Sequence, residues 1–161
     1  ELGMDIKTIV AALGEAEPEC GRQEVLHARD GFMVVNDAYN ANPDSMRASL
    51  LMFSALDIPG RRIAVLGDMG ELGDHARPCH EDIGVLVASL KIDYLICIGE
   101  ESRHLLDTAC ACGMDADDVY FASSIGDILG VLEKSVEEGD AVLVKASHFM
   151  GLERVVGGLV N

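Results

Sequence analysis

Tryptophan is absent from the 161-residue chain, and only 4% of its residues are aromatic. Proteins that bind single-stranded nucleic acids stack the bases on aromatic side chains, so the sequence offers few such platforms. Positive charge is also scarce, because 12 lysines and arginines stand against 28 aspartates and glutamates, for a net charge of −16. A surface of this sign repels a phosphate backbone. We therefore expect no nucleic-acid partner.

Long apolar runs are lacking as well. No run reaches the roughly 18 residues of a membrane-spanning helix, and no basic-then-apolar leader opens the chain. The five cysteines are odd in number and match no zinc-ligand spacing. We expect reduced thiols, no metal site in this chain, no membrane association and a cytoplasmic location. Because the chain begins with Glu1 instead of Met, we interpret it as a piece of a longer protein.

Complete catalytic motifs are also missing. The sequence has no G-x-x-x-x-G-K-[ST] phosphate loop, no G-x-G-x-x-G fingerprint and no Ser-His-Asp or Cys-His arrangement. We therefore expect no catalytic residue here, only side chains that bind and orient ligands.

From about residue 30, short apolar segments alternate with amphipathic helical segments. The apolar segments predict strands at 32–35, 62–66, 94–98, 119–122 and 141–144. Continuous apolar strands are typical of a parallel sheet that helices cover on both faces. We predict a Rossmann-like, doubly wound α/β fold with a mostly parallel sheet of about six strands. The first 19 residues differ, with a short helical pattern and then an acidic stretch containing Pro18, and indicate a linker or the tail of a preceding domain.

Ligands of doubly wound sheets bind where the strands end, and the first such loop is rich in polar side chains: Asp37, Tyr39, Asn40 and Asn42. A carboxylate at a strand end can accept hydrogen bonds from ribose hydroxyls. Asn42 before Pro43 also fits a helix N-cap, so a ligand site and a simple polar turn both stay open. Arg22 is one of the few cations and could share the ligand of Asp37.

Two later loops are further candidates. Asp68 and Glu71 lie in the glycine-rich stretch 67–73 and could bind an ammonium group, and His80 follows near the next helix. The segment 145–148 supplies a cation, a hydroxyl and an imidazole before a helix N-terminus, where an anion can dock. These three side chains belong to Lys145, Ser147 and His148. The alternatives are a flexible acidic loop, a structural histidine and a surface lysine.

Together these segments resemble the carboxyl-terminal domain of the Mur ligases. The resemblance rests on the stretches DAYNANPDSM (37–46), LGDMGELG (66–73) with His80 and Gly84, and VKASH (144–148), which follow the family's order. Within the family, they are similar to the ligases that join D-alanyl-D-alanine to UDP-N-acetylmuramoyl-tripeptide. The resemblance implies a three-domain cytoplasmic enzyme of peptidoglycan synthesis, with residues 20–161 as its third domain and 1–19 as a linker and the tail of its central domain. In that reaction ATP and Mg²⁺ activate the tripeptide carboxylate as an acyl phosphate, which the dipeptide amine attacks.

The resemblance also assigns sides to the candidate residues. It implies nucleotide contacts for Arg22, Asp37, Tyr39, Asn40 and Asn42. It implies that the dipeptide side is lined or supported by Asp68, Glu71, His80, Lys145, Ser147 and His148. The phosphate loop, the metal ligands and the UDP-sugar site would lie in the missing N-terminal and central domains, so the chain alone is expected to be inactive. The alternative is a non-catalytic nucleotide- or ligand-binding α/β module.

One position departs from the family pattern. Many relatives carry Lys-Gly-Ser-Arg where this chain has Lys-Ala-Ser-His at 145–148. An arginine clamps a carboxylate through two parallel hydrogen bonds and a histidine does not, so the resemblance implies no simple carboxylate clamp at His148.

Overall fold

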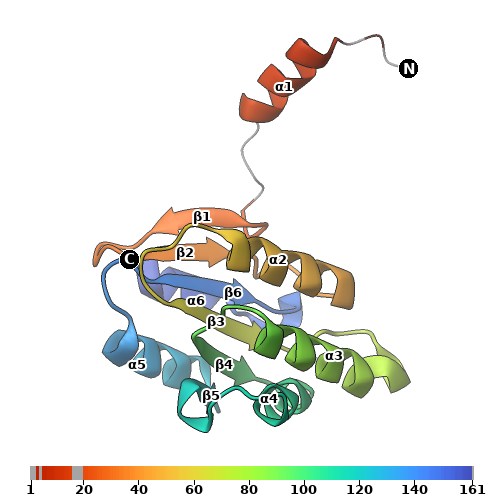
Figure 1. Cartoon of the computed structure of the whole chain (residues 1–161), viewed down its shortest axis with the longest axis vertical. Helices are drawn as coiled ribbons and strands as arrows, with labels where there is room; N and C mark the ends of the chain where they lie inside the picture. Colours follow the sequence, from red (N-terminus) through yellow and green to blue (C-terminus); the bar gives the residue numbers. More distant parts are fainter. Residues whose placement is uncertain (1–2, 4, 16–19, 161) are drawn as a thin grey trace.

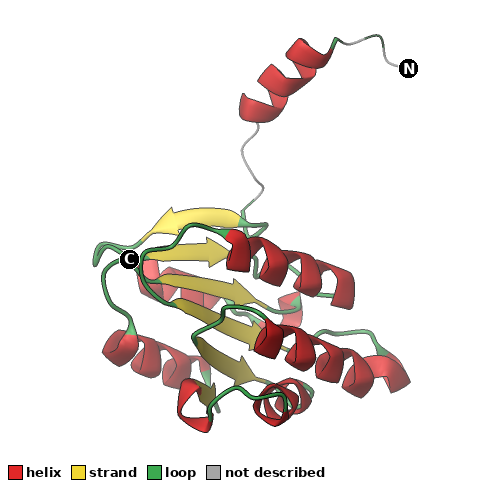
Figure 2. Ribbon diagram, viewed as in Figure 1, coloured by secondary structure: helices red, strands yellow, loops and turns green. Residues whose placement is uncertain are grey.

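The computed structural model describes residues 3, 5–15 and 20–160 and contains a six-stranded sheet in the order β1-β2-β6-β3-β4-β5. The strands are β1 (Glu24–His27), β2 (Met33–Asn36), β3 (Arg62–Gly67), β4 (Tyr94–Ile98), β5 (Val119–Phe121) and β6 (Ala141–Lys145). Strands β2 to β6 run parallel, and β1 pairs antiparallel with β2 at the edge (Figure 2). The predicted, mostly parallel α/β sheet is confirmed.

Helices cover both faces of this sheet (Figure 1). They are α2 (Pro43–Ala55), α3 (Ala76–Ser89), α4 (Ser102–Ala111), α5 (Ile125–Ser135) and α6 (Glu153–Val160). A further helix, α1 (Ile6–Glu15), precedes β1 in the chain and covers neither face. Helices α2, α3 and α4 pack on the face that carries Leu66 and Leu143, and α5 and α6 pack on the face that carries Val65 and Val144. Strand side chains alternate between faces, so continuous apolar strands supply both cores. Within the described residues, no helix is long and apolar enough to cross a membrane.

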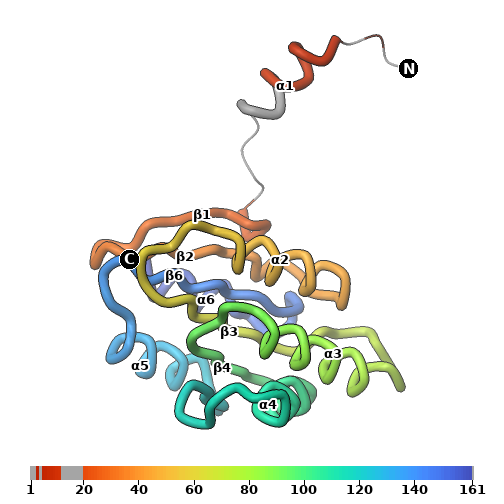
Figure 3. The backbone as a smooth tube through the Cα atoms, in the orientation of Figure 1, coloured from red at the N-terminus to blue at the C-terminus, as the bar shows by residue number. Residues whose placement is uncertain are grey.

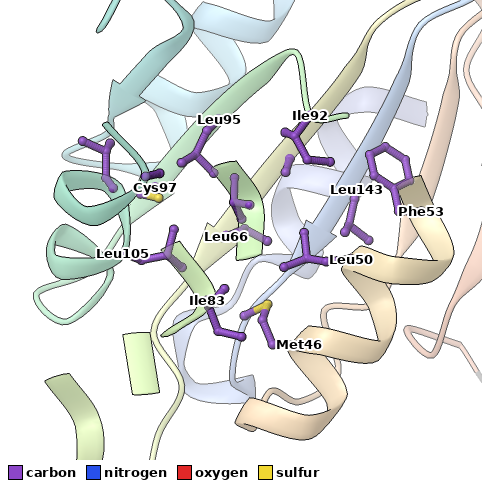
Figure 4. Close-up of a cluster of buried hydrophobic side chains, with 14 of the residues drawn as sticks. Met46, Leu50, Phe53, Leu66, Ile83, Ile92, Leu95, Cys97, Leu105 and Leu143 are labelled. Carbon is purple, nitrogen blue, oxygen red and sulfur yellow. The ribbon is translucent and has the colours of Figure 1, made fainter. Parts of the chain in front are cut away.

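The core beneath α2 fixes that helix against the sheet (Figure 4). Met46, Leu50 and Phe53 recur at intervals of four and three residues, share one face of α2 and are fully buried. Burial of each such side chain stabilises the fold by roughly 1.5–3 kcal/mol. The loop that precedes α2, which carries several candidate residues, is therefore held by a well-packed helix.

Strand β1 is an element that the sequence pattern did not predict. Its four residues alternate between half-buried and exposed, without the continuous apolar character of the other strands. The Glu24 carboxylate accepts hydrogen bonds from the Asn36 side chain (2.9 Å) and from the Gly21 N–H (3.2 Å). Figure 3 shows the β1 backbone lying along β2. This pairing brings the turn at 21–23 beside the carboxyl end of β2.

The connections after β2, β6 and β3 create a crevice at the carboxyl edge of the sheet. Strand β6 lies between β2 and β3. The chain leaves β2 toward α2 and leaves β3 toward α3 on one face, but it leaves β6 toward α6 on the other. Such a switch point separates the loops above adjacent strands and is where doubly wound sheets bind ligands.

Asp140, which is almost fully buried, anchors the amino end of β6. Its carboxylate accepts hydrogen bonds from the Arg61 backbone N–H (2.7 Å), the Arg61 guanidinium (2.7 Å) and the Glu137 N–H (3.0 Å). Burial by itself would raise the pKa of Asp140, but the Arg61 side chain and these N–H donors outweigh burial and hold the pKa below its ordinary value.

Replacement of Asp140 by asparagine is expected to remove a pH-dependent part of the stability. Because the pKa is lower in the folded than in the unfolded state, the charged carboxylate stabilises the fold above the unfolded-state value, and this contribution is lost as the pH falls through the folded-state value. We expect Asp140→Asn to lower the free energy of unfolding by about 1 kcal/mol at pH 7. Urea unfolding should show the difference shrinking from about pH 5 toward pH 3. A difference that does not change with pH would contradict this assignment.

Candidate functional site

Two neighbouring hollows open at the carboxyl edge of the sheet and share a ridge of polar residues. The larger hollow has a volume of about 590 Å³ and is lined by residues 39–42, 70–72 and 147–149. The smaller hollow has a volume of about 400 Å³ and is lined by the 22–23 turn, the start of α2, Asp37, Lys145 and three residues of the ridge. Tyr39, Asn40 and Asn42 line both hollows and form this ridge. The volumes of both hollows lie within the usual range for small-molecule sites.

A buried ion pair lies beneath the smaller hollow. The Lys145 ammonium group is 2.7 Å from the Asp37 carboxylate, and the two side chains are 1% and 10% exposed. The same carboxylate accepts hydrogen bonds from the Ser49 hydroxyl and from the Gln23 N–H, and Lys145 also donates to the Asn40 carbonyl (2.9 Å). The pair thus joins β2, β6, α2 and the 21–23 turn. The resemblance had separated Asp37 and Lys145 between two ligands, whereas the structure brings them together.

The structure places Arg22 at the same hollow as Asp37, through an unusual turn. Gly21 and Gln23 have left-handed φ angles of 77° and 52°, and the Gly21 carbonyl accepts a hydrogen bond from the Tyr39 N–H (3.0 Å). The Arg22 guanidinium carbon lies 4.4 Å from the centroid of the half-exposed Tyr39 ring. The His148 ring lies on the side of the larger hollow, with its centroid 5.9 Å from that of Tyr39. Tyr39 therefore contacts groups of both hollows.

Ser147 holds the walls of the larger hollow together. Its hydroxyl, which is buried, donates to the Ala41 carbonyl (3.0 Å) and accepts from the Gly70 N–H (2.8 Å). Its backbone N–H donates to the Asp68 carbonyl (3.0 Å). These bonds connect the loops that follow β2, β3 and β6, so one side chain sets the spacing between three predicted segments.

Asp68 and His80 lie behind the wall and line neither hollow. The Asp68 carboxylate accepts hydrogen bonds from the Ser102 N–H (2.8 Å) and hydroxyl (2.6 Å) at the start of α4. The His80 ring is fully buried, and its Nε2 accepts from the Met69 N–H (3.0 Å) while Nδ1 donates to the Ala76 carbonyl (2.7 Å). This pattern assigns the neutral tautomer with the proton on Nδ1. Both residues support the 67–73 loop.

The remaining residues predicted for the site lie at its surface. Glu71 is exposed at the larger hollow and has a left-handed φ of 62°, and Asn42 caps α2 by accepting a hydrogen bond from the Ser45 N–H (2.8 Å). The predicted cap is therefore confirmed, and Asn42 lines both hollows as well. The hollows are also lined by residues that were not predicted for the site: Gln23, Ala41, Ser45, Ala48, Gly70, Leu72 and Phe149. Gly70 and Leu72 lie in the predicted stretch 67–73, and Phe149 directly follows the predicted segment 145–148, but the part that each plays at the hollow depends on its tertiary contacts.

The described residues contain no group of three His, Cys, Asp or Glu side chains placed to hold a metal ion. Burial raises the pKa of the Cys97 thiol far above its ordinary value, so this cysteine is an inert core side chain. The site therefore offers hydrogen-bonding groups, one aromatic ridge and charges of both signs.

Residues 21–148 match the family model described as "Mur ligase, glutamate ligase domain". The chain therefore belongs to the Mur ligase family and corresponds to the C-terminal domain of the family's members. It is similar to UDP-N-acetylmuramoyl-tripeptide–D-alanyl-D-alanine ligases. The ligase of Bacillus subtilis (strain 168) is 33% identical over 140 residues, which are 87% of this chain and 30% of that protein. The ligase of Mycobacterium tuberculosis (strain H37Rv) is 36% identical over 178 residues, with 99% of this chain and 35% of that protein covered.

Solved structures agree. The chain superposes on MurF from Acinetobacter baumannii with a TM-score of 0.80 at 27% identity, covering 98% of this chain and 34% of that one. It superposes on MurF ligase from Thermotoga maritima in complex with ADP with a TM-score of 0.75 at 26% identity, covering 94% and 35%. The resemblance predicted from the loop motifs is confirmed. The chain spans about a third of the length of these relatives.

Proposed function

We propose that this chain is the substrate-positioning C-terminal domain of an ATP-dependent ligase that adds D-alanyl-D-alanine to UDP-N-acetylmuramoyl-tripeptide. The observation that carries the proposal is the pair of hollows on either side of the Tyr39 ridge, with Arg22 at one and Glu71 and His148 at the other. Two adjacent sites with different charges suit a domain that holds two substrates side by side. The non-catalytic ligand-binding module remains the second candidate, because its hollows would be the same.

The smaller hollow would hold part of the nucleotide. Its lining includes Arg22 and Lys145, and the Lys145 charge is already balanced by Asp37. In a chain with a net charge of −16, the Arg22 guanidinium would contribute positive charge to this hollow and favour an anionic ligand there. Tyr39 beside it supplies an aromatic surface, and the side chains of Asn40 and Asn42 supply donors and acceptors.

The larger hollow would hold the dipeptide. The Glu71 carboxylate would pair with its amino group, and the amides of Asn40 and Asn42 with the His148 ring would donate to its carboxylate. Held in this way, the amine would approach the activated tripeptide in a fixed orientation, which turns an encounter between separate molecules into an oriented attack. This domain would position the dipeptide, and the tripeptide carboxylate would be converted to the acyl phosphate at a site in the other domains.

The metal, most ATP contacts and the domain bounds can be assigned from the residues that this chain contains. Since the described residues provide no cluster of metal ligands, we assign Mg²⁺ and most ATP phosphate contacts to the preceding central domain. We assign residues 1–19 to the end of that domain and a linker, and residues 20–161 to the third domain. Ile6 and Val10 of α1 are 78% and 63% exposed, which suits a helix that packs against another domain. The linker itself lies largely in residues 16–19, outside the described residues. Because its substrates are nucleotide-linked precursors, we place the enzyme in the cytoplasm.

Phosphate release tests the proposal. The chain alone is expected to show no turnover with ATP and D-alanyl-D-alanine, whereas the complete protein should release phosphate only when UDP-N-acetylmuramoyl-tripeptide and the dipeptide are both present. In the complete protein, Arg22→Gln should raise the KM for ATP about tenfold, because a charge-assisted hydrogen bond to phosphate is lost. Arg77→Gln, at an exposed position on α3, is the matched control and should leave it unchanged.

Other outcomes separate the two candidates. Turnover by the chain alone at the rate of the complete protein would contradict the positioning role. A complete protein that binds ADP but shows no dipeptide-dependent phosphate release, or whose reading frame lacks a phosphate loop, would favour the non-catalytic module.

A further inference from the structure

Phe149 is exposed in a chain that otherwise covers its phenylalanines. Its side chain is 69% exposed, whereas Phe32 and Phe53 are buried and Phe121 is half-buried beneath the Arg103 guanidinium. An exposed ring leaves apolar surface in water that burial would stabilise. Phe149 lines the larger hollow together with the half-buried Leu72. The two side chains add apolar surface to the lining of the larger hollow.

The backbone beneath this ring is well anchored. Phe149 lies on the short 3₁₀ helix η3 (His148–Met150), directly after the buried Ser147. The Met150 N–H donates to the Ser147 carbonyl (3.0 Å), and the Gly151 N–H donates to the His148 carbonyl (3.1 Å). Gly151 closes the turn with a left-handed φ of 66°. The ring is therefore presented at the hollow by a rigid turn.

The facing loop leaves space for the ring. A Cβ atom at Gly70 would lie 2.8 Å from Phe149 Cε1, closer than carbon atoms approach in folded proteins. Because Gly70 lacks that atom, the ring edge packs against the 67–73 loop while the rest of the ring stays open to the hollow. The Gly70 N–H is held at 2.8 Å by the Ser147 hydroxyl, so both partners of this contact are fixed by the same residue.

The charges around the hollow indicate what the ring would contact. Besides the Tyr39 ring, its lining carries the Glu71 carboxylate, the His148 imidazole and the side-chain amides of Asn40 and Asn42. A ligand that suits this lining carries an amino group, a carboxylate and small apolar substituents. We propose that Phe149, with Leu72, contacts a methyl side chain of the dipeptide and determines the preference for alanyl over glycyl residues. This inference rests on the function proposed above and adds a specificity-determining residue to it.

The expected effect is modest and selective. Burial of one methyl group against an apolar wall corresponds to about a fourfold gain in affinity. Loss of the ring should therefore lower kcat/KM for D-alanyl-D-alanine about fourfold. The kcat/KM for glycyl-glycine, which lacks both methyl groups, should stay unchanged. A general loss of positioning would weaken both dipeptides equally.

Steady-state phosphate release by the complete protein tests this, with D-alanyl-D-alanine and glycyl-glycine as alternative substrates. We expect Phe149→Ala to lower the ratio of their kcat/KM values about fourfold through a higher KM for D-alanyl-D-alanine, with the KM for ATP unchanged. Phe149→Leu should restore most of the ratio. Val85→Ala, which removes a half-exposed apolar side chain from α3, is the control and should leave it unchanged. If glycyl-glycine turns over too slowly, its inhibition constant against D-alanyl-D-alanine replaces its KM.

Each outcome separates this inference from the proposed function. If the wild-type enzyme is active and Phe149→Ala has the same ratio of kcat/KM values, or loses activity equally toward both dipeptides, only the role of Phe149 is overturned. A wild-type complete protein that turns over neither dipeptide overturns the proposed function and this inference with it.

Discussion

Replacement of Lys145 by methionine is expected to lower the free energy of unfolding by about 3–5 kcal/mol. Methionine keeps much of the volume of the lysine stem but removes the ammonium group that lies 2.7 Å from the Asp37 carboxylate. The carboxylate would then stay in a nearly buried position without its cation, and the Asn40 carbonyl would lose its donor. Urea unfolding monitored by circular dichroism measures the loss.

Two comparisons isolate the ion pair as the cause. The double variant Lys145→Met with Asp37→Asn should recover more than half of the loss, because the buried charge is then gone. Arg77→Met breaks an ion pair with Glu81 whose side chains are 67% and 38% exposed, and should change stability little. If Lys145→Met is no more destabilising than Arg77→Met, the Asp37–Lys145 pair does not hold these loops together.

Replacement of Gly84 by alanine is expected to destabilise the protein by about 1–3 kcal/mol, although alanine normally favours a helix. Gly84 lies within α3, where an added Cβ would be 2.4 Å from the Leu105 carbonyl oxygen and 2.8 Å from Thr108 Cβ on α4. Both contacts are too short, so the two helices would have to separate. That shift would also reach Ser102, which holds Asp68 behind the larger hollow.

Replacement of Gly130 by alanine should change the free energy of unfolding in the opposite direction. Gly130 lies within α5, and a Cβ there would meet no heavy atom within 4 Å. Gly130→Ala is therefore expected to raise the free energy of unfolding by about 0.5–1 kcal/mol, as for an open helical position. Thermal and urea unfolding of both variants provide the test. A stabilising Gly84→Ala would show that α3 and α4 are not in close contact at this point.

Local signals in the sequence predicted much of the fold. The continuous apolar run at 94–98 is β4 with the predicted bounds, and Asn42 before Pro43 begins α2 as predicted. The spacing of Ser124 and Asp127 is typical of a capping box that opens a helix, but only half of this box forms at the start of α5. The Asp127 N–H does donate to the Ser124 hydroxyl, but the Asp127 carboxylate accepts from Ser123 instead of the Ser124 backbone.

Strand β1 marks the limit of such signals. Four residues with one exposed valine carry little apolar periodicity, and the segment is a strand because it pairs with β2. Arg22 stands out in the sequence as one of few cations even when this strand is not predicted. Only the pairing, with the turn at 21–23, explains how Arg22 comes to lie beside Tyr39.

By itself, the sequence determined the class of fold, the family and the loops that line the candidate site, because apolar periodicity, caps and motif residues act over a few positions of the chain. Only the tertiary structure decided the partners. It paired Asp37 with Lys145, placed Asp68 and His80 behind the wall of the larger hollow, and left Phe149 exposed in it. These outcomes depend on which strands are neighbours and on the close packing of side chains that are distant in sequence. Neither property can be predicted from the local sequence pattern.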